Sequence, residues 1–244
     1  MEVHHHSHTP RKKWSHYFWE FFMLFLAVFC GFLAENQREH YVEHQREKQF
    51  IRSLAEDLAT DTVELKRAIG KADTVIRFSD SAVRILRSHV ASEKIPAPLV
   101  GFVGRAGQNQ NLINTDRTSS QLKNSGAMRL IRNREVSNLI LAYWKQIEQS
   151  NISLERYMLY RNASRELVFK LWVIPEVYGA GSLERGTIEQ YRVIDQDSKK
   201  WDELTNLIAI SGTITRQAHI INLSRQLTTA RDLISLMQKE YHLK

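Results

Sequence analysis

The feature that most constrains this chain is an apolar stretch near its N-terminus, from Tyr17 to Ala34, which only Glu20 interrupts. At a rise of 1.5 Å per residue, a helix over this run spans roughly 27 Å, which is close to the thickness of a bilayer's hydrocarbon core. A polar sequence begins abruptly at Glu35. The stretch therefore predicts a transmembrane helix over residues 14–36.

Cationic and aromatic residues stand at the N-terminal side of the stretch, as they do at membrane–water interfaces. The predicted interface anchors are Arg11, Lys12, Lys13, Trp14, Tyr17 and Trp19. Positive charge before the span and little after it predicts a cytoplasmic N-terminus, by the positive-inside rule. We therefore expect a single-pass protein of the inner membrane, with residues 37–244 outside the cytoplasm, in the periplasm of a Gram-negative source.

Three other interpretations of the stretch compete with an uncleaved signal anchor. A cleavable signal peptide requires small residues at positions −3 and −1, where the segment GFLAEN offers Phe32 and Ala34. A lipoprotein site requires small residues before the cysteine, but Phe29 precedes Cys30. A buried core helix would not explain the flanking cations and aromatic residues. The sequence therefore favours the uncleaved anchor.

Three residues within the span indicate a contact with another membrane helix. Glu20 lies about one and a half turns inside, counted from Lys13. It either extends to the nearby headgroups or makes a polar contact with a partner helix. Ala27 and Gly31 form a small-xxx-small pair, which permits close helix approach. We therefore predict Glu20, Ala27 and Gly31 as the helix–helix contact in the membrane.

The rest of the chain carries the pattern of long amphipathic helices. Only four prolines and ten glycines occur in 244 residues, which favours helices over a turn-rich β fold. Apolar residues repeat every seven positions at Ile51, Leu58, Leu65, Ala72 and Leu86, interleaved with Leu54, Ala68, Val75 and Ala82. Similar stripes cover 134–174 and the region from about Ser198 to Tyr241, where Gly212 is a candidate bend.

These stripes predict an all-α protein, in which a single N-terminal transmembrane helix continues into an elongated antiparallel helical bundle. We expect three regions. Residues 1–13 form a short basic, His-rich cytoplasmic tail, residues 14–36 form the transmembrane signal anchor, and residues 37–244 form an extracytoplasmic helical-bundle domain.

Local signals predict where these helices begin and end. The segment EKIPAPLVGFVGRAGQNQN (93–111) contains two prolines and three glycines, and we expect a loop there. Asp116, Asn133 and either Asp197 or Ser198 are expected to cap helices, because their side chains accept hydrogen bonds from the first free N–H groups. A second loop is expected after Pro175. Between them, Ser125 and Gly126 are predicted either to form a turn or to shape a partner site, with Leu130 and Ile131 packing beneath.

Two short segments resemble a family of bacterial single-pass membrane proteins of the Bacteroidota type, whose function is not known. One is FIRSLAEDL (50–58), and the other is LKNSGAMRLIRN (122–133). The resemblance implies the same order of features: a basic N-terminus, one transmembrane helix and a long helix that follows it. It implies no activity, and the His-rich start of this chain departs from the family's pattern.

No pattern in the chain completes a catalytic, metal or cofactor site. The histidines His4, His5, His6 and His8 are potential ligands, but a solvated tail is the simpler interpretation of a terminus. His40 and His44 share a helix face without a third ligand, and Glu43 is misplaced for a metalloprotease motif. The glycines at 101, 104 and 107 lack the G-K-[ST] of a phosphate loop. We expect no enzyme, no metal and no cofactor.

Charge and cysteine content exclude further classes of function. The net charge is +7, but Lys and Arg are interspersed with Asp and Glu, as on a solvated helical surface or one that attracts anionic lipid or an acidic partner. No zinc finger or RNP motif supports nucleic-acid binding. The single cysteine excludes a disulfide framework.

The sequence thus predicts a membrane-anchored structural or interaction protein, a scaffold or accessory subunit of an envelope complex. The expected partners are the lipid bilayer and other envelope proteins or a second copy of the chain, and the sequence identifies no small-molecule substrate. The alternative is an extracytoplasmic sensory or regulatory bundle that acts through a partner membrane protein, because helical bundles can pass small shifts along their axes.

Overall fold

The computed structural model describes residues 14–88, 94–173 and 190–243. Helices dominate these residues, and the prediction of an all-α fold with a helical bundle is confirmed. The chain divides into two compact units, Met1–Gln49 and Phe50–Lys244. One helix, α1 (Trp14–Ser88), contributes to both units. Each unit is described below by itself.

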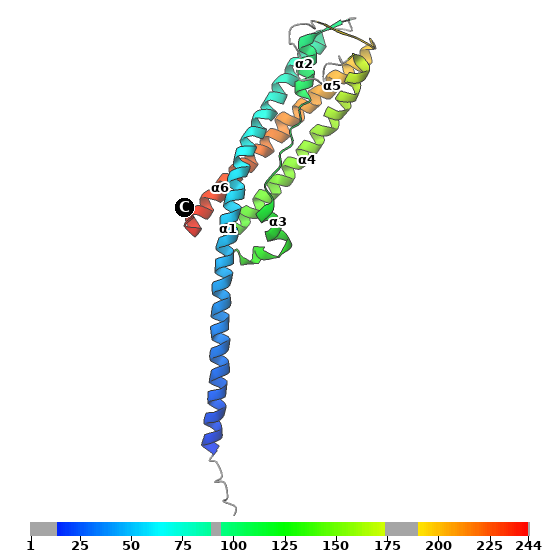
Figure 1. Cartoon of the computed structure of the whole chain (residues 1–244). Helices are drawn as coiled ribbons and strands as arrows, with labels where there is room; N and C mark the ends of the chain where they lie inside the picture. Colours follow the sequence, from blue (N-terminus) through cyan, green and yellow to red (C-terminus); the bar gives the residue numbers. More distant parts are fainter. Residues whose placement is uncertain (1–13, 89–93, 174–189, 244) are drawn as a thin grey trace, which may run out of the picture. The chain divides into compact units, whose positions relative to one another are not determined.

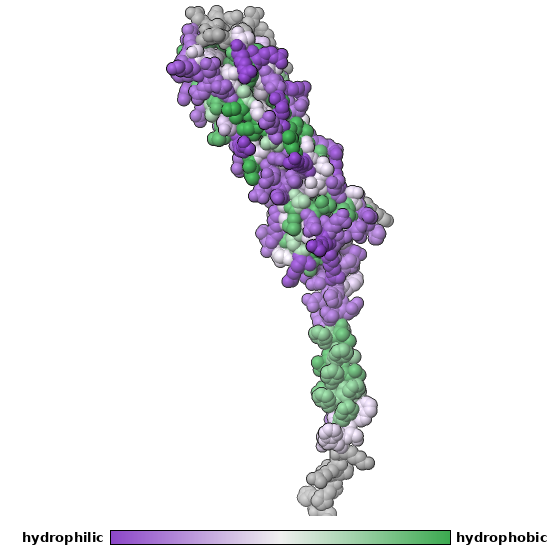
Figure 2. Space-filling model, turned by 180° about the vertical axis from the view of Figure 1, so that it is seen from behind, coloured by the Kyte–Doolittle hydropathy of each residue, from purple (hydrophilic) through white to green (hydrophobic). Residues whose placement is uncertain are grey.

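The described part of the N-terminal unit is a helix with an uncovered apolar surface. Large apolar and aromatic side chains from Trp14 to Leu33 are exposed. Figure 2 shows a continuous hydrophobic band on this helix, with a paler section toward the helix start. Phenylalanines four residues apart stack along it, with ring centroids 6.4 Å apart for Phe21 and Phe25 and 5.9 Å apart for Phe25 and Phe29. By length and composition, α1 contains a segment able to cross a membrane.

The C-terminal unit is built on three long helical stretches. These are the part of α1 from Phe50 onward, α4 (Arg134–Leu171), and a stretch formed by α5 (Ser198–Ile214), the π-helical turn η3 (Thr215–His219) and α6 (Ile220–Tyr241). In Figure 1 the stretches of α1 and α4 run in one direction, and α5 to α6 return in the opposite direction.

A crossover joins the end of α1 to the start of α4. It contains β1 (Lys94–Pro96), α2 (Ala97–Ala106), a non-helical run over 107–116, α3 (Arg117–Asn124) and the 3₁₀ turn η1 (Ala127–Leu130). Figure 1 shows the run over 107–116 passing lengthwise along the bundle from α2 to α3. At the α2 end, β1 pairs in antiparallel fashion with β2 (Gln190–Arg192).

The heptad pattern correctly predicted the core face of α1. All nine positions of the predicted stripe are buried. They pack against α4, α5, α6 and the crossover in clusters that follow one another along the bundle. The two positions at which the repeat lacks an apolar residue, Asp61 and Ser79, are also buried.

The prediction of a loop over 93–111 is wrong for most of its described residues, because they form β1 and α2. Only the run from 107 onward is non-helical. Pro96 precedes α2 and Pro98 lies in its first turn, where a missing N–H costs no helical hydrogen bond. Leu99, Val103 and Ala106 then follow helical spacing and are buried. The burial of this face outweighs the low helix propensity of the intervening glycines. The second expected loop, after Pro175, lies outside the described residues.

The helix is continuous at Gly212, which the sequence marked as a candidate bend. Helix α5 continues through it to Ile214, and the irregularity comes at η3. Instead, Gly212 lies where α5 meets α1, because a Cβ at this position would be 2.8 Å from the Cβ of Ser79. The glycine therefore permits close contact between the two helices.

Two of the three predicted caps are confirmed. The side chain of Asn133 accepts hydrogen bonds from the backbone N–H groups of Glu135 and Val136 at 3.0 and 3.1 Å. Asp197 accepts one from Lys199 at 3.0 Å. Asp116 occupies the N-cap position of α3 but caps no backbone N–H. Its carboxylate accepts from the Ser120 hydroxyl instead, at 3.3 Å.

Candidate functional site

The predicted membrane-interface anchors lie at the start of α1. Arg11, Lys12 and Lys13 fall outside the described residues. Trp14, Tyr17 and Trp19 are 87%, 56% and 60% exposed. Large aromatic side chains left this open are unusual on a water-soluble surface, and their polar N–H and O–H groups suit a headgroup region.

The predicted membrane contact lies on one face of the same helix. Glu20, Ala27 and Gly31 are separated by seven and four residues, which places them on one side of α1. All three are exposed, and nothing lies within 4 Å of the position that a Cβ of Gly31 would take. Within the described part of this unit, the face is open to another helix.

The predicted turn site at Ser125 and Gly126 is an ordered helix ending. Gly126 has a φ of +67°, the left-handed conformation that glycine adopts without strain. The Ser125 hydroxyl donates to the carbonyl of Gln121 at 2.6 Å and accepts from the N–H of Ala127 at 3.3 Å. Leu130 is half-buried and Ile131 is buried beneath the turn. The hydroxyl thus takes part in the turn itself.

The sequence analysis missed a group of buried and half-buried polar side chains around the crossover. We call it the polar layer. It comprises Asp57, Asp61, Gln110, Asn114, Tyr143, Ser150, Ser153, Tyr157, His219 and Gln226. A non-helical run within a bundle leaves backbone N–H and C=O groups that need partners. The layer supplies several of these.

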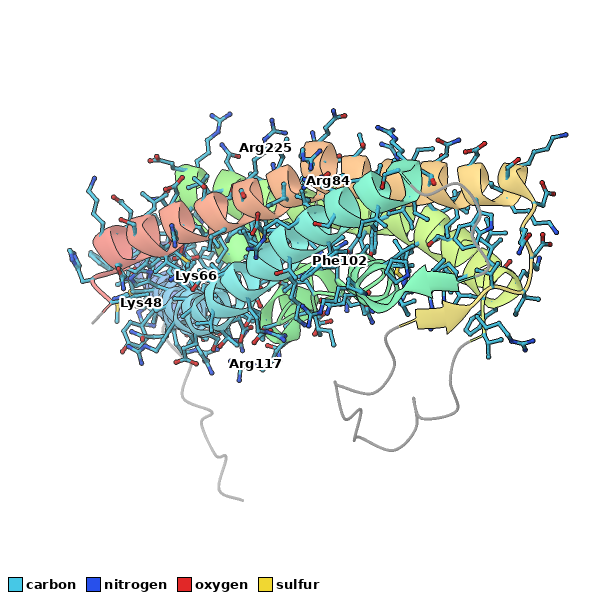
Figure 3. The ribbon with its side chains drawn as sticks, turned by 90° about the horizontal axis from the view of Figure 1, so that it is seen from above. Lys48, Lys66, Arg84, Phe102, Arg117 and Arg225 are labelled. Carbon is cyan, nitrogen blue, oxygen red and sulfur yellow. The ribbon has the colours of Figure 1, made fainter. Side chains whose placement is uncertain are left out.

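Two aspartates of α1 hold the start of α3. Asp57, which is 3% exposed, accepts from the Arg117 guanidinium at 2.7 Å and from the N–H of Thr118 at 2.9 Å. Asp61 accepts from the N–H of Thr115 at 2.7 Å. Figure 3 labels Arg117, whose side chain is largely exposed. The carboxylates therefore fix the backbone where the crossover turns into α3.

Tyr143 of α4 connects Asp61 to the opposite helices. Its hydroxyl donates to Asp61 at 2.5 Å. Burial is the main cause that raises the pKa of both groups, while the hydrogen bonds that Asp61 accepts lower its pKa in part. Gln226 accepts from the Ser150 hydroxyl at 2.9 Å and donates to the Asn114 side chain at 2.6 Å. The layer thus links α1, the crossover, α4 and α6.

The end of α2 is held from α4. The Tyr157 hydroxyl lies 3.0 Å from the carbonyl of Ala106 and 2.7 Å from that of Gln108. The Arg161 guanidinium donates to the carbonyl of Gly107 at 3.0 Å. Burial raises the pKa of Tyr157, and the neutral phenol that this favours is the form able to donate.

His219 is the most isolated titratable group of the layer. It ends the π-helical turn η3, and its Nδ1 lies 3.0 Å from the Ser153 hydroxyl. Its Nε2 is buried without a hydrogen-bond partner, as is the Gln110 side-chain oxygen. Burial lowers the pKa of His219 to about 4, so the imidazole is neutral at pH 7.

The hydrogen bonds of the polar layer serve mainly to hold the crossover against the bundle. Among the described residues, no three His, Cys, Asp or Glu side chains are grouped as metal ligands. His44 of the N-terminal unit lies 3.3 Å from Glu47, and His40 is exposed. The carboxylates and amides mostly accept from or donate to the crossover and to one another. These contacts position the crossover.

The heptad repeat did contain a signal for the layer. The interleaved series Leu54, Ala68, Val75, Ala82 passes through Asp61, a member of the layer. A polar residue at a core position of a helix must find a partner. No comparable signal marks His219 or Gln226, because polar residues occur on the outer faces of the same helices.

Comparisons with known proteins gave no match. No family model matches the chain, and no curated protein or solved structure is significantly similar to it.

Proposed function

We propose that this chain is a single-pass membrane protein that binds or scaffolds other proteins of a bacterial envelope. The observation that carries the proposal is the uncovered apolar band of α1, in which large side chains from Trp14 to Leu33 are exposed. Exposed apolar surface of this extent marks a membrane or a protein interface. Its helical length matches a bilayer.

The charge distribution supports an orientation for this proposal. Arg11, Lys12 and Lys13 precede the apolar band, whereas Glu35 follows it and pairs with Arg38. Cations before a span favour a cytoplasmic N-terminus. The unit over 50–244 then lies on the outer side of the inner membrane, in the periplasm. The resemblance of 50–58 and 122–133 to the Bacteroidota-type membrane family supports the same arrangement.

An open helix face supports a protein partner within the membrane. The face formed by Glu20, Ala27 and Gly31 combines a polar group with two small residues, and such faces let helices approach and bond in lipid. The partner that this chemistry fits is a membrane helix with a polar side chain, from an envelope protein or from a second copy.

Orientation is tested with reporters fused after Lys244 in intact cells. We expect alkaline phosphatase to be active there and green fluorescent protein to be dark, because the first requires export and the second fluoresces only when it folds inside. Moving Arg11, Lys12 and Lys13 to positions just after Asn36 is the control, and it should reverse both signals. Cytoplasmic fluorescence from the unaltered chain would contradict the proposal.

The partner is tested with a photo-crosslinking amino acid at Gly31 in the membrane of living cells. We expect a specific adduct from this face and a much weaker one from Phe29, which is exposed on the opposite side of the helix. Equal adducts from both positions, or a monomer without adducts, would refute a specific membrane partner. The mass of the adduct distinguishes a second copy from another protein.

A specific observation also supports the sensory alternative. The π-helical turn η3 interrupts the return stretch, and it contains the buried His219, whose Nε2 has no partner. Such turns often mark functional sites. A regulator of this kind should gain thermal stability when its ligand binds. If a broad metabolite screen leaves the unfolding temperature of the full chain unchanged, the sensory role is excluded for the compounds tested.

A further inference from the structure

A groove lies between α2 and the last turns of α4, away from the polar layer's aspartates. It has a volume of about 390 Å³. Its walls are Val100, Val103 and Gly104 from α2 and Arg165, Val168 and Phe169 from α4. The volume is within the range of about 300–1,000 Å³ that small-molecule sites occupy, at its lower end.

The groove is open because α2 lacks a side chain where one would fill it. No atom lies within 4 Å of the position that a Cβ of Gly104 would take. On its other side, α2 is packed: Phe102, labelled in Figure 3, lies 5.7 Å from the ring of Phe78 in α1. A glycine within a helix costs about 1 kcal/mol relative to alanine, and here it leaves an apolar surface uncovered.

The α4 wall presents the features of an amphiphile site. Phe169 is 59% exposed, although it is a large apolar side chain. Trp172 also lines the groove, and its buried indole N–H has no hydrogen-bond partner. Buried indole N–H groups are normally bonded, so this one is a donor available to a polar group in the groove.

The charge at the groove has one sign. Arg165 is exposed and makes no ion pair among the described residues. Arg161, one turn earlier, donates to Gly107 and keeps its positive charge beside the same wall. No Asp or Glu is among the described residues that line the groove. The electrostatic field there favours an anion, and a guanidinium is suited to hold a carboxylate through two hydrogen bonds.

We infer that this groove binds a single-chain anionic amphiphile of the fatty-acid class. The acyl chain lies along Val100, Val103 and Phe169, and the carboxylate bonds to Arg165. A volume of about 390 Å³ favours one chain over the two of a phospholipid. The inference rests on the unit over 50–244 alone, so it does not depend on the membrane anchor or its orientation.

Equilibrium dialysis of the full chain in nanodiscs against radiolabelled dodecanoate tests the inference, with empty nanodiscs subtracted. Gly104→Leu fills the groove and should weaken binding at least about tenfold, which corresponds to the loss of about 1.4 kcal/mol. Gly101→Leu is the matched control, since Gly101 lies on the same helix, has nothing within 4 Å of its Cβ position and does not line the groove. It should change the dissociation constant less than twofold.

The role of charge is tested with Arg165→Gln and with 1-dodecanol as a neutral probe. We expect the variant to weaken dodecanoate binding about tenfold or more, because it removes the charged donor that bonds the carboxylate, and to leave dodecanol binding unchanged. Circular dichroism confirms that each variant is folded.

Three results would overturn the inference. The first is no saturable dodecanoate binding to the unaltered chain. The second is equal loss in Gly101→Leu and Gly104→Leu, which would place binding elsewhere. The third is a dimer in sedimentation that Gly104→Leu dissociates, which would show that a second copy occupies the groove.

Discussion

The contact between Gly212 of α5 and Ser79 of α1 gives the sharpest test of the bundle. Replacing Gly212 with alanine adds one methyl group, whose carbon would be 2.8 Å from the Ser79 Cβ and 3.1 Å from its Oγ. The Ser79 Cβ is attached to the backbone and cannot rotate away, so the two helices must separate. Overpacking of this kind costs about 1–3 kcal/mol.

A second effect has the opposite sign. Alanine is favoured over glycine within a helix by about 1 kcal/mol. Gly70→Ala isolates this gain, because Gly70 is exposed within α1 and nothing lies within 4 Å of its Cβ position. We therefore expect Gly70→Ala to raise the free energy of unfolding by about 0.5–1 kcal/mol. Gly212→Ala should be about 1–3 kcal/mol less stable than Gly70→Ala.

The assay is thermal unfolding of the full chain, followed by circular dichroism at the helix band. For a chain of this size, 1 kcal/mol corresponds to roughly 2–4 °C in the unfolding temperature. Removing the other side of the contact, in the double variant Ser79→Gly with Gly212→Ala, should restore most of the loss and give a coupling energy above about 0.5 kcal/mol. Additive effects, or a Gly212→Ala variant as stable as Gly70→Ala, would refute the close approach.

Three further results are expected in the same assay. Tyr143→Phe leaves Asp61 without the donor that lies at 2.5 Å, and it should destabilise the chain by about 1–3 kcal/mol. The pKa of His219 is lowered to about 4, below its ordinary 6.5. As the pH falls, the unfolded state therefore binds the proton before the folded state does. The free energy of unfolding is unaffected by this group above pH 6.5 and should fall by about 3 kcal/mol as the pH drops to 4. A His219→Gln variant should lack that part of the pH dependence, and an unchanged profile would contradict the burial. Asn133→Ala removes a cap that accepts two N–H groups and should cost about 1 kcal/mol, whereas Asn138→Ala, exposed within α4, should cost nothing measurable.

The sequence predicted those elements in which one physical effect dominates. The core face of α1 followed from spacing alone, since burying Ile51, Leu58 and Leu65 on one side requires only helical periodicity. Asn133 and Asp197 were predicted as caps because the hydrogen bonds of a cap are local. The membrane span of α1 remains a prediction from length, composition and exposure.

The sequence did not predict elements that depend on distant partners. Helix α2 forms despite two prolines and three glycines nearby, because α1, α4 and α5 bury its apolar face. The role of Gly212 in letting α5 approach α1 depends on Ser79, which lies more than 130 residues earlier in the sequence. The polar layer depends on pairs such as Asn114 and Gln226, which no local pattern relates.

The long sequence separation between Gln226 and its partners has a consequence for biogenesis. Gln226 bonds Asn114 of the crossover and Ser150 of α4, which are 112 and 76 residues earlier in the sequence. A ribosome must therefore add 112 residues after Asn114 before the Asn114 side-chain oxygen acquires this donor and the Ser150 hydroxyl acquires this acceptor. Until then the middle of the α1 core stripe, which packs against α6 through Leu223 and Leu227, is uncovered, and apolar surface exposed in this way makes a nascent chain prone to aggregation.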